Sequence, residues 1–154
     1  MLKKVKMPRI NFMNTFTNPF VKVLARSPLH NLVDQGVILI IFTGRKSGKS
    51  ITVPVNYLLD EQTIHVISIR HRNWWRNLKG GASVEVLLKG KQHNGWAVLE
   101  EEQKIVAREL DMFCGHNPKY AQFLKVGLNP DGIPDPKQLL DAARDRVAII
   151  IKLS

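Results

Sequence analysis

Residues 37–55 read VILIIFTGRKSGKSITVPV, and this stretch decides the fold. Its first seven residues, Val37–Thr43, are apolar and mostly β-branched, which predicts a buried strand. The next six, Gly44–Lys49, contain three cations, two glycines and a hydroxyl, which is typical of a turn. Ser50–Leu59 then predicts a second strand, in which Pro54 favours an edge position or a bulge. This stretch therefore predicts a basic turn between two strands.

The residues after this pair of strands continue to predict β structure. Asp60–Gln62 has the composition of a turn, and Thr63–Ile69 has that of a third strand. After a tryptophan-rich segment, the pattern predicts strands over Ser83–Leu88 and Gly95–Leu99, a hairpin connection over Lys89–Asn94, and a further strand over Gln103–Arg108.

The last third of the chain changes period and predicts helices. Asn117 followed by Pro118 has the form of an N-cap and a first helical turn, and it precedes a helix over Lys119–Val126. Asp135-Pro136 repeats this signal before a helix to about Ala143, and Val147–Leu153 predicts a final strand. Six or seven short strands with a few helices indicate a mainly β (α+β) protein, built as a small closed or half-open antiparallel barrel.

The chain of 154 residues is most simply one domain preceded by an arm. Residues 1–26 are expected to form a basic arm and a helix, because Phe12, Phe16 and Phe20 recur at helical spacing. Residues 27–154 are expected to form the folded domain. The helix would cover one end of the core or, since lysines and arginines accompany it, lie on an anionic membrane.

The charge of the chain is unevenly distributed. Residues 1–99 carry 15 Lys and Arg against four acids, a net charge of +11, whereas residues 100–154 carry −1. Such a field attracts an anionic partner: nucleic acid, anionic lipid or a phosphorylated cofactor. The single cysteine, Cys114, excludes an internal disulfide, and no apolar run approaches the roughly 20 residues of a membrane span. The basic N-terminus lacks the apolar block of a secretory signal, so a cytoplasmic protein is expected, with membrane association left open.

The basic turn is close in sequence to a phosphate-binding P-loop but differs in spacing and in the segment after it. The spacing between Gly44 and Gly48 is one residue short, and Ile51–Val55 favours a strand over the helix that a P-loop needs. This excludes a nucleotide triphosphatase. The turn can still bind an anion, with a solvated basic hairpin as the alternative. The groups suited to this are its backbone N–H groups, the cations of Arg45, Lys46 and Lys49, and the hydroxyl of Ser47.

A second candidate segment holds two adjacent tryptophans, Trp74 and Trp75, followed by Arg76 and Asn77. On a short helix neighbouring side chains lie about 100° apart, so one indole can pack in the core while the other lines a cleft. Asn77 can donate and accept hydrogen bonds at the edge of a heterocycle. Tyr57 is the candidate proton donor or substrate-orienting hydroxyl, with strand packing as the alternative. The five histidines show no metal-ligand spacing, so no metal site is expected.

These motifs together resemble the flavin- and deazaflavin-dependent oxidoreductases, and more narrowly the deazaflavin-dependent nitroreductase and quinone reductase family. The resemblance covers residues 24–99 and, more loosely, the rest of the chain. It implies a split β-barrel that binds a flavin-like cofactor. The residues that carry it are the GRKSGK turn at 44–49, Thr52-x-Pro54-Val55 with Tyr57, Trp75-x-Asn77-Leu78 before a valine-rich strand, and upstream Ser27-Pro28-Leu29-His30.

The resemblance also implies roles for individual residues. The basic turn would hold the phosphate or acidic tail of the cofactor, the strand after it would run beside the tricyclic ring, and the tryptophan segment would help close the site. The tail contacts map onto Arg45, Lys46, Ser47, Gly48 and Lys49, the ring contacts onto Thr52, Pro54 and Val55, and the closing segment onto Trp75, Arg76 and Asn77.

The implied reaction is hydride transfer from the reduced deazaflavin coenzyme F(420) to an electron-poor small-molecule acceptor: a quinone, a nitro compound or an activated alkene. Many members carry a glycine-rich loop where this chain has the short cationic segment Arg70–Arg72, so FMN stays open as the alternative cofactor. Two other functions stay open: a flavin-, haem- or lipid-binding protein without turnover on the same barrel, and a basic nucleic-acid-binding module. For the oxidoreductase no nucleic-acid partner is expected, and a homodimer is left open.

Overall fold

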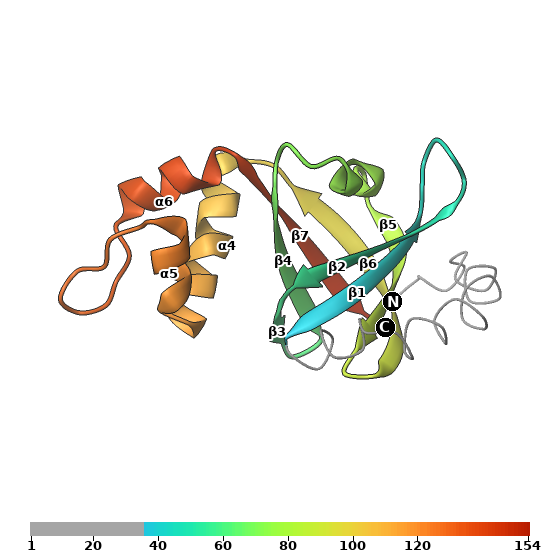
Figure 1. The fold of residues 1–154 in the computed structure, drawn as a ribbon, viewed down its shortest axis with the longest axis horizontal. Coiled ribbons are helices and arrows are strands. Elements are labelled where there is room, and N and C mark those ends of the chain that lie inside the picture. Colours follow the sequence, from blue (N-terminus) through green and yellow to red (C-terminus); the bar gives the residue numbers. More distant parts are fainter. Residues whose placement is uncertain (1–35) are drawn as a thin grey trace.

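The computed structural model describes residues 36–154, which form an antiparallel sheet that curls into a half-barrel with helices to one side (Figure 1). The order across this seven-stranded sheet is β2-β1-β5-β6-β7-β4-β3. The expected mainly β fold, the antiparallel barrel and the split-barrel resemblance are thus confirmed. The strands are β1 (Val37–Thr43), β2 (Ser50–Asn56), β3 (Leu58–Asp60), β4 (Thr63–Ile69), β5 (Ala82–Leu88), β6 (Lys91–Glu100) and β7 (Arg146–Leu153).

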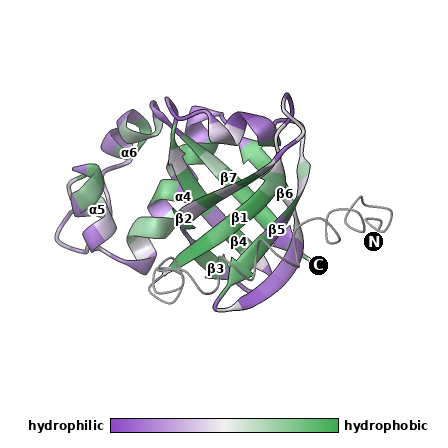
Figure 2. Cartoon of the chain, turned by 45° about the vertical axis from the view of Figure 1, so that its right-hand side comes forward, coloured by the Kyte–Doolittle hydropathy of each residue, from purple (hydrophilic) through white to green (hydrophobic). Residues whose placement is uncertain are grey.

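The core lies on the inner face of the curled sheet. From β1 it takes Ile38, Ile40 and Phe42, which alternate along the strand and are at most 1% exposed. Val86 of β5 and Ile149 of β7 join them from strands far apart in the sequence. Figure 2 shows hydrophobic residues concentrated on these strands and hydrophilic residues on their connections. The apolar stretch after residue 36 therefore forms a central strand of the barrel, as its composition predicts.

The strand expected over Ser50–Leu59 is two strands in the structure. β2 pairs with β1, from Val37 opposite Asn56 to Thr43 opposite Ser50, and forms one edge of the sheet. β3 pairs with β4 and forms the other edge. The edge position indicated by Pro54 is confirmed. Because β2 and β3 serve opposite edges, the chain must leave the sheet between them, at Tyr57.

The hairpin connection expected over Lys89–Asn94 is wrong. β6 begins at Lys91 and pairs with β5 from Leu88 opposite Lys91 onward. The connection is the two-residue turn of Lys89 and Gly90, both with positive φ, at 50° and 80°. This backbone matches the right-handed twist of the paired strands, and glycine adopts it without strain.

The strand expected over Gln103–Arg108 is also wrong, because these residues begin the helix α4 (Gln103–His116). Val106, Leu110 and Phe113 recur at helical spacing and are all buried. The segment Gln103–Arg108 contains only the first of these residues, so it does not show the helical pattern. The other two helices were predicted: α5 (Lys119–Leu124), two residues shorter than expected, and α6 (Pro136–Ala143). The α6 cap forms as predicted, since Asp135 Oδ1 accepts from the Lys137 and Gln138 N–H groups. The α5 cap differs: Pro118 is the N-cap and makes no side-chain cap bond, and Asn117 Oδ1 accepts from the Lys119 N–H in the turn before the helix.

The three helices pack together in a second cluster, which rests on the outer face of β7 through Ala148. A contact between His65 of β4 and Glu109 of α4 links this helical cluster to the sheet. Nδ1 of His65 and Oε1 of Glu109 are 2.8 Å apart, and both side chains are largely buried. Within residues 36–154, no helix has the length and apolarity needed to cross a bilayer. The expected arm and helix of residues 1–26, the segment Ser27–His30 and the domain boundary after residue 26 lie outside the described residues or are not tested, and they stay predictions.

Candidate active site

The basic turn between β1 and β2 is closed by its own backbone. The Gly44 N–H donates to the Lys49 carbonyl at 2.8 Å, and the Gly48 N–H donates back to the Gly44 carbonyl at 2.9 Å. Ser47 Oγ accepts from the Lys49 N–H at 3.1 Å. Among the described residues, the N–H groups of Lys46 and Ser47 donate no hydrogen bond. Two successive free donors in a cationic turn are the elements of an anion-binding nest.

A short 3-10 helix, η2 (Trp74–Leu78), fastens this turn to the end of the sheet. The Asn77 side chain makes the connection: its Oδ1 accepts from the Arg45 N–H at 2.9 Å, and its Nδ2 donates to the Trp74 carbonyl at 2.9 Å. The Arg45 guanidinium also donates to the Lys79 carbonyl. Asn77 therefore holds two parts of the site together, which the sequence did not indicate.

A cavity of about 620 Å³ opens between the turn and η2, and we call it the basic cavity. Four cationic residues line it, together with the backbone of the turn, and no carboxylate does. Lys49 is not among the lining residues. The cations are Arg45, Lys46, Arg76 and Lys79. Such a wall, with free N–H groups beside it, suits a multiply charged anion such as a phosphate with neighbouring carboxylates.

The two tryptophans of η2 separate in the way that a short helix allows. Trp75 is 1% exposed and belongs to the core, where its ring carries the Arg76 guanidinium at 4.6 Å from the centroid. Trp75 therefore contacts Arg76, a cation of the basic cavity, but does not itself line the cavity. Trp74 is half-buried, and its Nε1 donates to Ser68 Oγ at 3.2 Å. Of the two rings, Trp74 is the one that faces a cavity.

That second cavity, of about 190 Å³, lies where β2 and β4 approach the helices, and we call it the aromatic cavity. Pro54 and Val55 of β2 contribute to its wall, as do Trp74 and, from α5, Tyr120 and Phe123. Arg72 adds an exposed cation. Burial raises the pKa of Tyr120 to about 12, so its hydroxyl stays protonated at neutral pH. The cavity offers flat apolar surfaces, a hydroxyl donor and a guanidinium to an aromatic molecule.

Of the predicted site residues, Tyr57 and Thr52 line neither cavity, as is also the case for Gly48, Lys49 and Trp75. Tyr57, between β2 and β3, packs against the core, and burial raises the pKa of its hydroxyl. Thr52 stands on the outer face of β2, opposite in direction to Ile51 and Val53, which pack against the core. Its Oγ1 is buried and finds no hydrogen-bond partner in the described part of the chain. The roles assigned to Tyr57 and Thr52 stay predictions.

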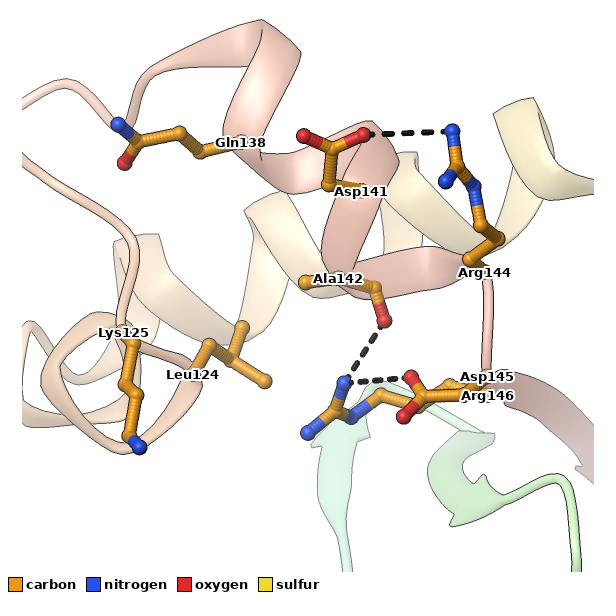
Figure 3. A pocket seen from close by; sticks show the side chains of 8 residues that line it. All are labelled: Leu124, Lys125, Gln138, Asp141, Ala142, Arg144, Asp145 and Arg146. Atoms are coloured by element: carbon orange, nitrogen blue, oxygen red, sulfur yellow. Dashed lines mark hydrogen bonds and ion pairs between the residues drawn. The ribbon is translucent and has the colours of Figure 1, made fainter.

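A third pocket, of about 620 Å³, lies between α5 and α6, far along the chain from the basic turn. Figure 3 shows that its arginines are already paired: Arg146 with the Ala142 carbonyl at 2.7 Å and Asp145 at 3.0 Å, and Arg144 with Asp141 at 3.5 Å. Carboxylates that neutralise the arginines make this pocket a weaker anion site than the basic cavity. In residues 36–154, no three His, Cys, Asp or Glu side chains gather as metal ligands.

The curled antiparallel sheet with a cationic cavity at one end defines a class: a split barrel whose cavity suits an anionic ligand. A family profile described as F420H(2)-dependent quinone reductase matches residues 15–126, and the chain belongs to this family. It is therefore an oxidoreductase, and its cofactor is the deazaflavin coenzyme F(420). The family resemblance read from the sequence is confirmed, and the expectation of a deazaflavin over FMN agrees with it.

Solved structures that are similar to this chain are distant from it in sequence. A candidate pyridoxamine 5'-phosphate oxidase from Listeria innocua is 16% identical, with a TM-score of 0.51 over 82% of this chain and 90% of that one. A candidate 5-nitroimidazole antibiotic resistance protein from Bacteroides thetaiotaomicron is 12% identical, with a TM-score of 0.50 over 80% and 75%. An F420-H2 dependent reductase is 19% identical, with a TM-score of 0.49 over 77% and 95%. A comparison with curated protein sequences gave no significant match.

Proposed function

We propose that this protein reduces a quinone with a hydride from the reduced deazaflavin coenzyme and holds the anionic tail of that coenzyme in the basic cavity. One observation carries the proposal: four cations and two free backbone donors converge on a cavity whose wall has no carboxylate. Charge-assisted hydrogen bonds of this kind contribute about 1.5–3 kcal/mol each.

The residues of the basic cavity bind and orient. Two of its cations come from different elements: Arg76 lies over the Trp75 ring on η2, and Lys46 lies in the closed turn. One anion can therefore bind both charges at once. Asn77 joins these two elements, because its Oδ1 accepts from the Arg45 N–H of the turn. When bound, the coenzyme supplies the hydride, and the protein supplies position and electrostatics.

The aromatic cavity is the proposed place of reaction with the acceptor. Pro54 and Val55, expected beside the cofactor ring, line it, and this supports placing ring and acceptor at that end of β2. The protonated Tyr120 hydroxyl can donate to a carbonyl oxygen of a quinone, and Arg72 can stabilise negative charge that develops there. Flat apolar walls favour an aromatic acceptor such as a quinone over a compact aliphatic one.

Equilibrium binding of the deazaflavin coenzyme, followed by its fluorescence, tests the tail site. Lys46→Gln and Arg76→Gln are each expected to weaken binding about tenfold, because each removes one charged donor from the wall. Lys49→Gln is the matched control, since it removes a cation of the same turn that does not line the cavity. Unchanged affinity in the first two variants, or an equal loss in the control, would refute this assignment.

The choice of cofactor is tested in the same titration with FMN as competitor. The basic cavity offers charge from two elements, which suits a tail with several separate anionic groups better than a single phosphate. The deazaflavin coenzyme is therefore expected to displace FMN. Tighter binding of FMN would overturn the preference. A homodimer and a contact of residues 1–26 with an anionic membrane stay proposals, to be checked by sedimentation and by vesicle binding.

A further inference from the structure

Glu101 lies beside the basic cavity, in the connection from β6 to α4. Its Oε2 is 3.5 Å from Lys79 Nζ, and its Oε1 is 3.3 Å from the Arg70 guanidinium. Of the salt bridges formed within residues 36–154, only the one to Lys79 engages a cation of the basic cavity. Glu101 thus neutralises part of the charge that would meet an anionic ligand.

The position of Glu101 does not depend on Lys79. Arg70 holds the Glu101 segment through its backbone as well, because its Nη2 donates to the Glu101 carbonyl at 3.0 Å and to the Arg146 carbonyl at 3.2 Å. The Arg70 N–H donates to the Asp145 carbonyl at 2.6 Å, which fixes Arg70 in turn. Lys79, by contrast, has a flexible four-carbon stem and a side chain 44% exposed. Lys79 is therefore the partner that can move.

We propose that Glu101 competes with the anionic tail of the ligand for Lys79, and so determines how much negative charge a ligand must carry to bind tightly. The inference rests on the proposed function of the basic cavity. A tail with several anionic groups can draw Lys79 away from Glu101, whereas a weakly charged tail leaves the pair closed. Glu101 acts through Lys79 and is a positioning residue that sets ligand selectivity.

The test compares Glu101→Gln with Glu102→Gln in the full chain. Glu102 is a suitable control because it carries the same charge one residue further on, is exposed, and makes no side-chain cap on α4. Two ligands are titrated: the deazaflavin coenzyme, and the same deazaflavin with its ribityl chain but no phosphate tail. Thermal unfolding of both variants reports any structural loss.

Glu101→Gln is expected to tighten binding of the complete coenzyme about two- to fivefold at low salt, the range of a half-exposed ion pair. It leaves the tail-less deazaflavin unchanged, and the gain disappears at about 1 M salt, where charges are screened within about 3 Å. A merely structural role would move both ligands together. Equal affinities of the two variants, or weaker binding in Glu101→Gln, would overturn the inference, whereas failure of the unaltered protein to bind the coenzyme would overturn the proposed function instead.

Discussion

Glu85 is the one carboxylate of residues 36–154 that is completely buried, and replacing it with glutamine tests how the barrel responds to pH. It lies on β5, opposite Ile41 of β1 and Asn94 of β6, with 0% of its surface exposed. Burial raises the pKa of this carboxyl from 4.5 to about 7, and the hydrogen bond from Gln92 only partly opposes that effect.

The sign and size of the effect are set by these two pKa values. The folded protein keeps the Glu85 proton up to about pH 7, whereas the unfolded chain releases it near 4.5. The stabilising contribution of the protonated carboxyl is complete below about pH 4.5, falls as the pH rises through this interval, and is lost above about pH 7. A difference of this size corresponds to about 3 kcal/mol in the free energy of unfolding.

Urea unfolding at about pH 4 and pH 8 measures this contribution, because it compares the free energy of unfolding on the two sides of the transition. Glu85→Gln keeps the shape and the acceptor for Gln92 but cannot ionise, so it is expected to gain stability relative to the unaltered protein as the pH rises. Glu102→Gln, at an exposed position, should behave like the unaltered protein. The reasoning fails if Glu85→Gln shows the same pH dependence as the unaltered protein.

Three further substitutions test other parts of the structure. Asn77→Ala removes the hydrogen bond to the Arg45 N–H, so it should lower the free energy of unfolding by about 1–2 kcal/mol and weaken coenzyme binding. An unchanged affinity for the coenzyme would show that the turn keeps its shape without Asn77. Gly81→Ala should destabilise by at least about 2 kcal/mol in urea unfolding, since φ is +92° and a Cβ would lie 2.6 Å from the Trp96 ring; a neutral result would contradict this packing. Asp135→Ala should cost about 1 kcal/mol in thermal unfolding through loss of the α6 cap, and no loss would place the cap elsewhere.

An element of the fold could be predicted where a few consecutive residues contain the whole pattern that specifies it. The apolar, β-branched run Val37–Thr43 and the cap before Pro136 are local patterns, and both formed as expected. The sequence does not predict α4, because its buried positions extend over more than two turns, whereas the segment Gln103–Arg108 alone has the pattern of a strand. The β5–β6 turn was missed because Lys89 adopts a positive φ, for which lysine gives no signal.

The candidate site could be predicted in part for the same reason. The cationic turn is evident from its composition, and Arg45 and Lys46 do line the basic cavity. Lys79 could not be predicted, because it lines the cavity together with a turn more than 30 residues earlier in the chain, and no local pattern marks that contact. The sequence also does not show which of the two indoles faces a cavity, because adjacent residues on a short helix have the same local pattern. Packing in the core decides this: Trp75 is buried there, and Trp74 lines the aromatic cavity.

Steady-state reduction of a quinone by the reduced deazaflavin coenzyme tests the central claim most directly, with Lys46→Gln compared against the unaltered protein and Lys49→Gln. If the basic cavity holds the tail and takes no part in the chemical step, Lys46→Gln raises the KM for the coenzyme about tenfold and leaves kcat almost unchanged. Absence of any quinone reduction by the unaltered protein, or a fall in kcat with an unchanged KM in Lys46→Gln, would contradict the account.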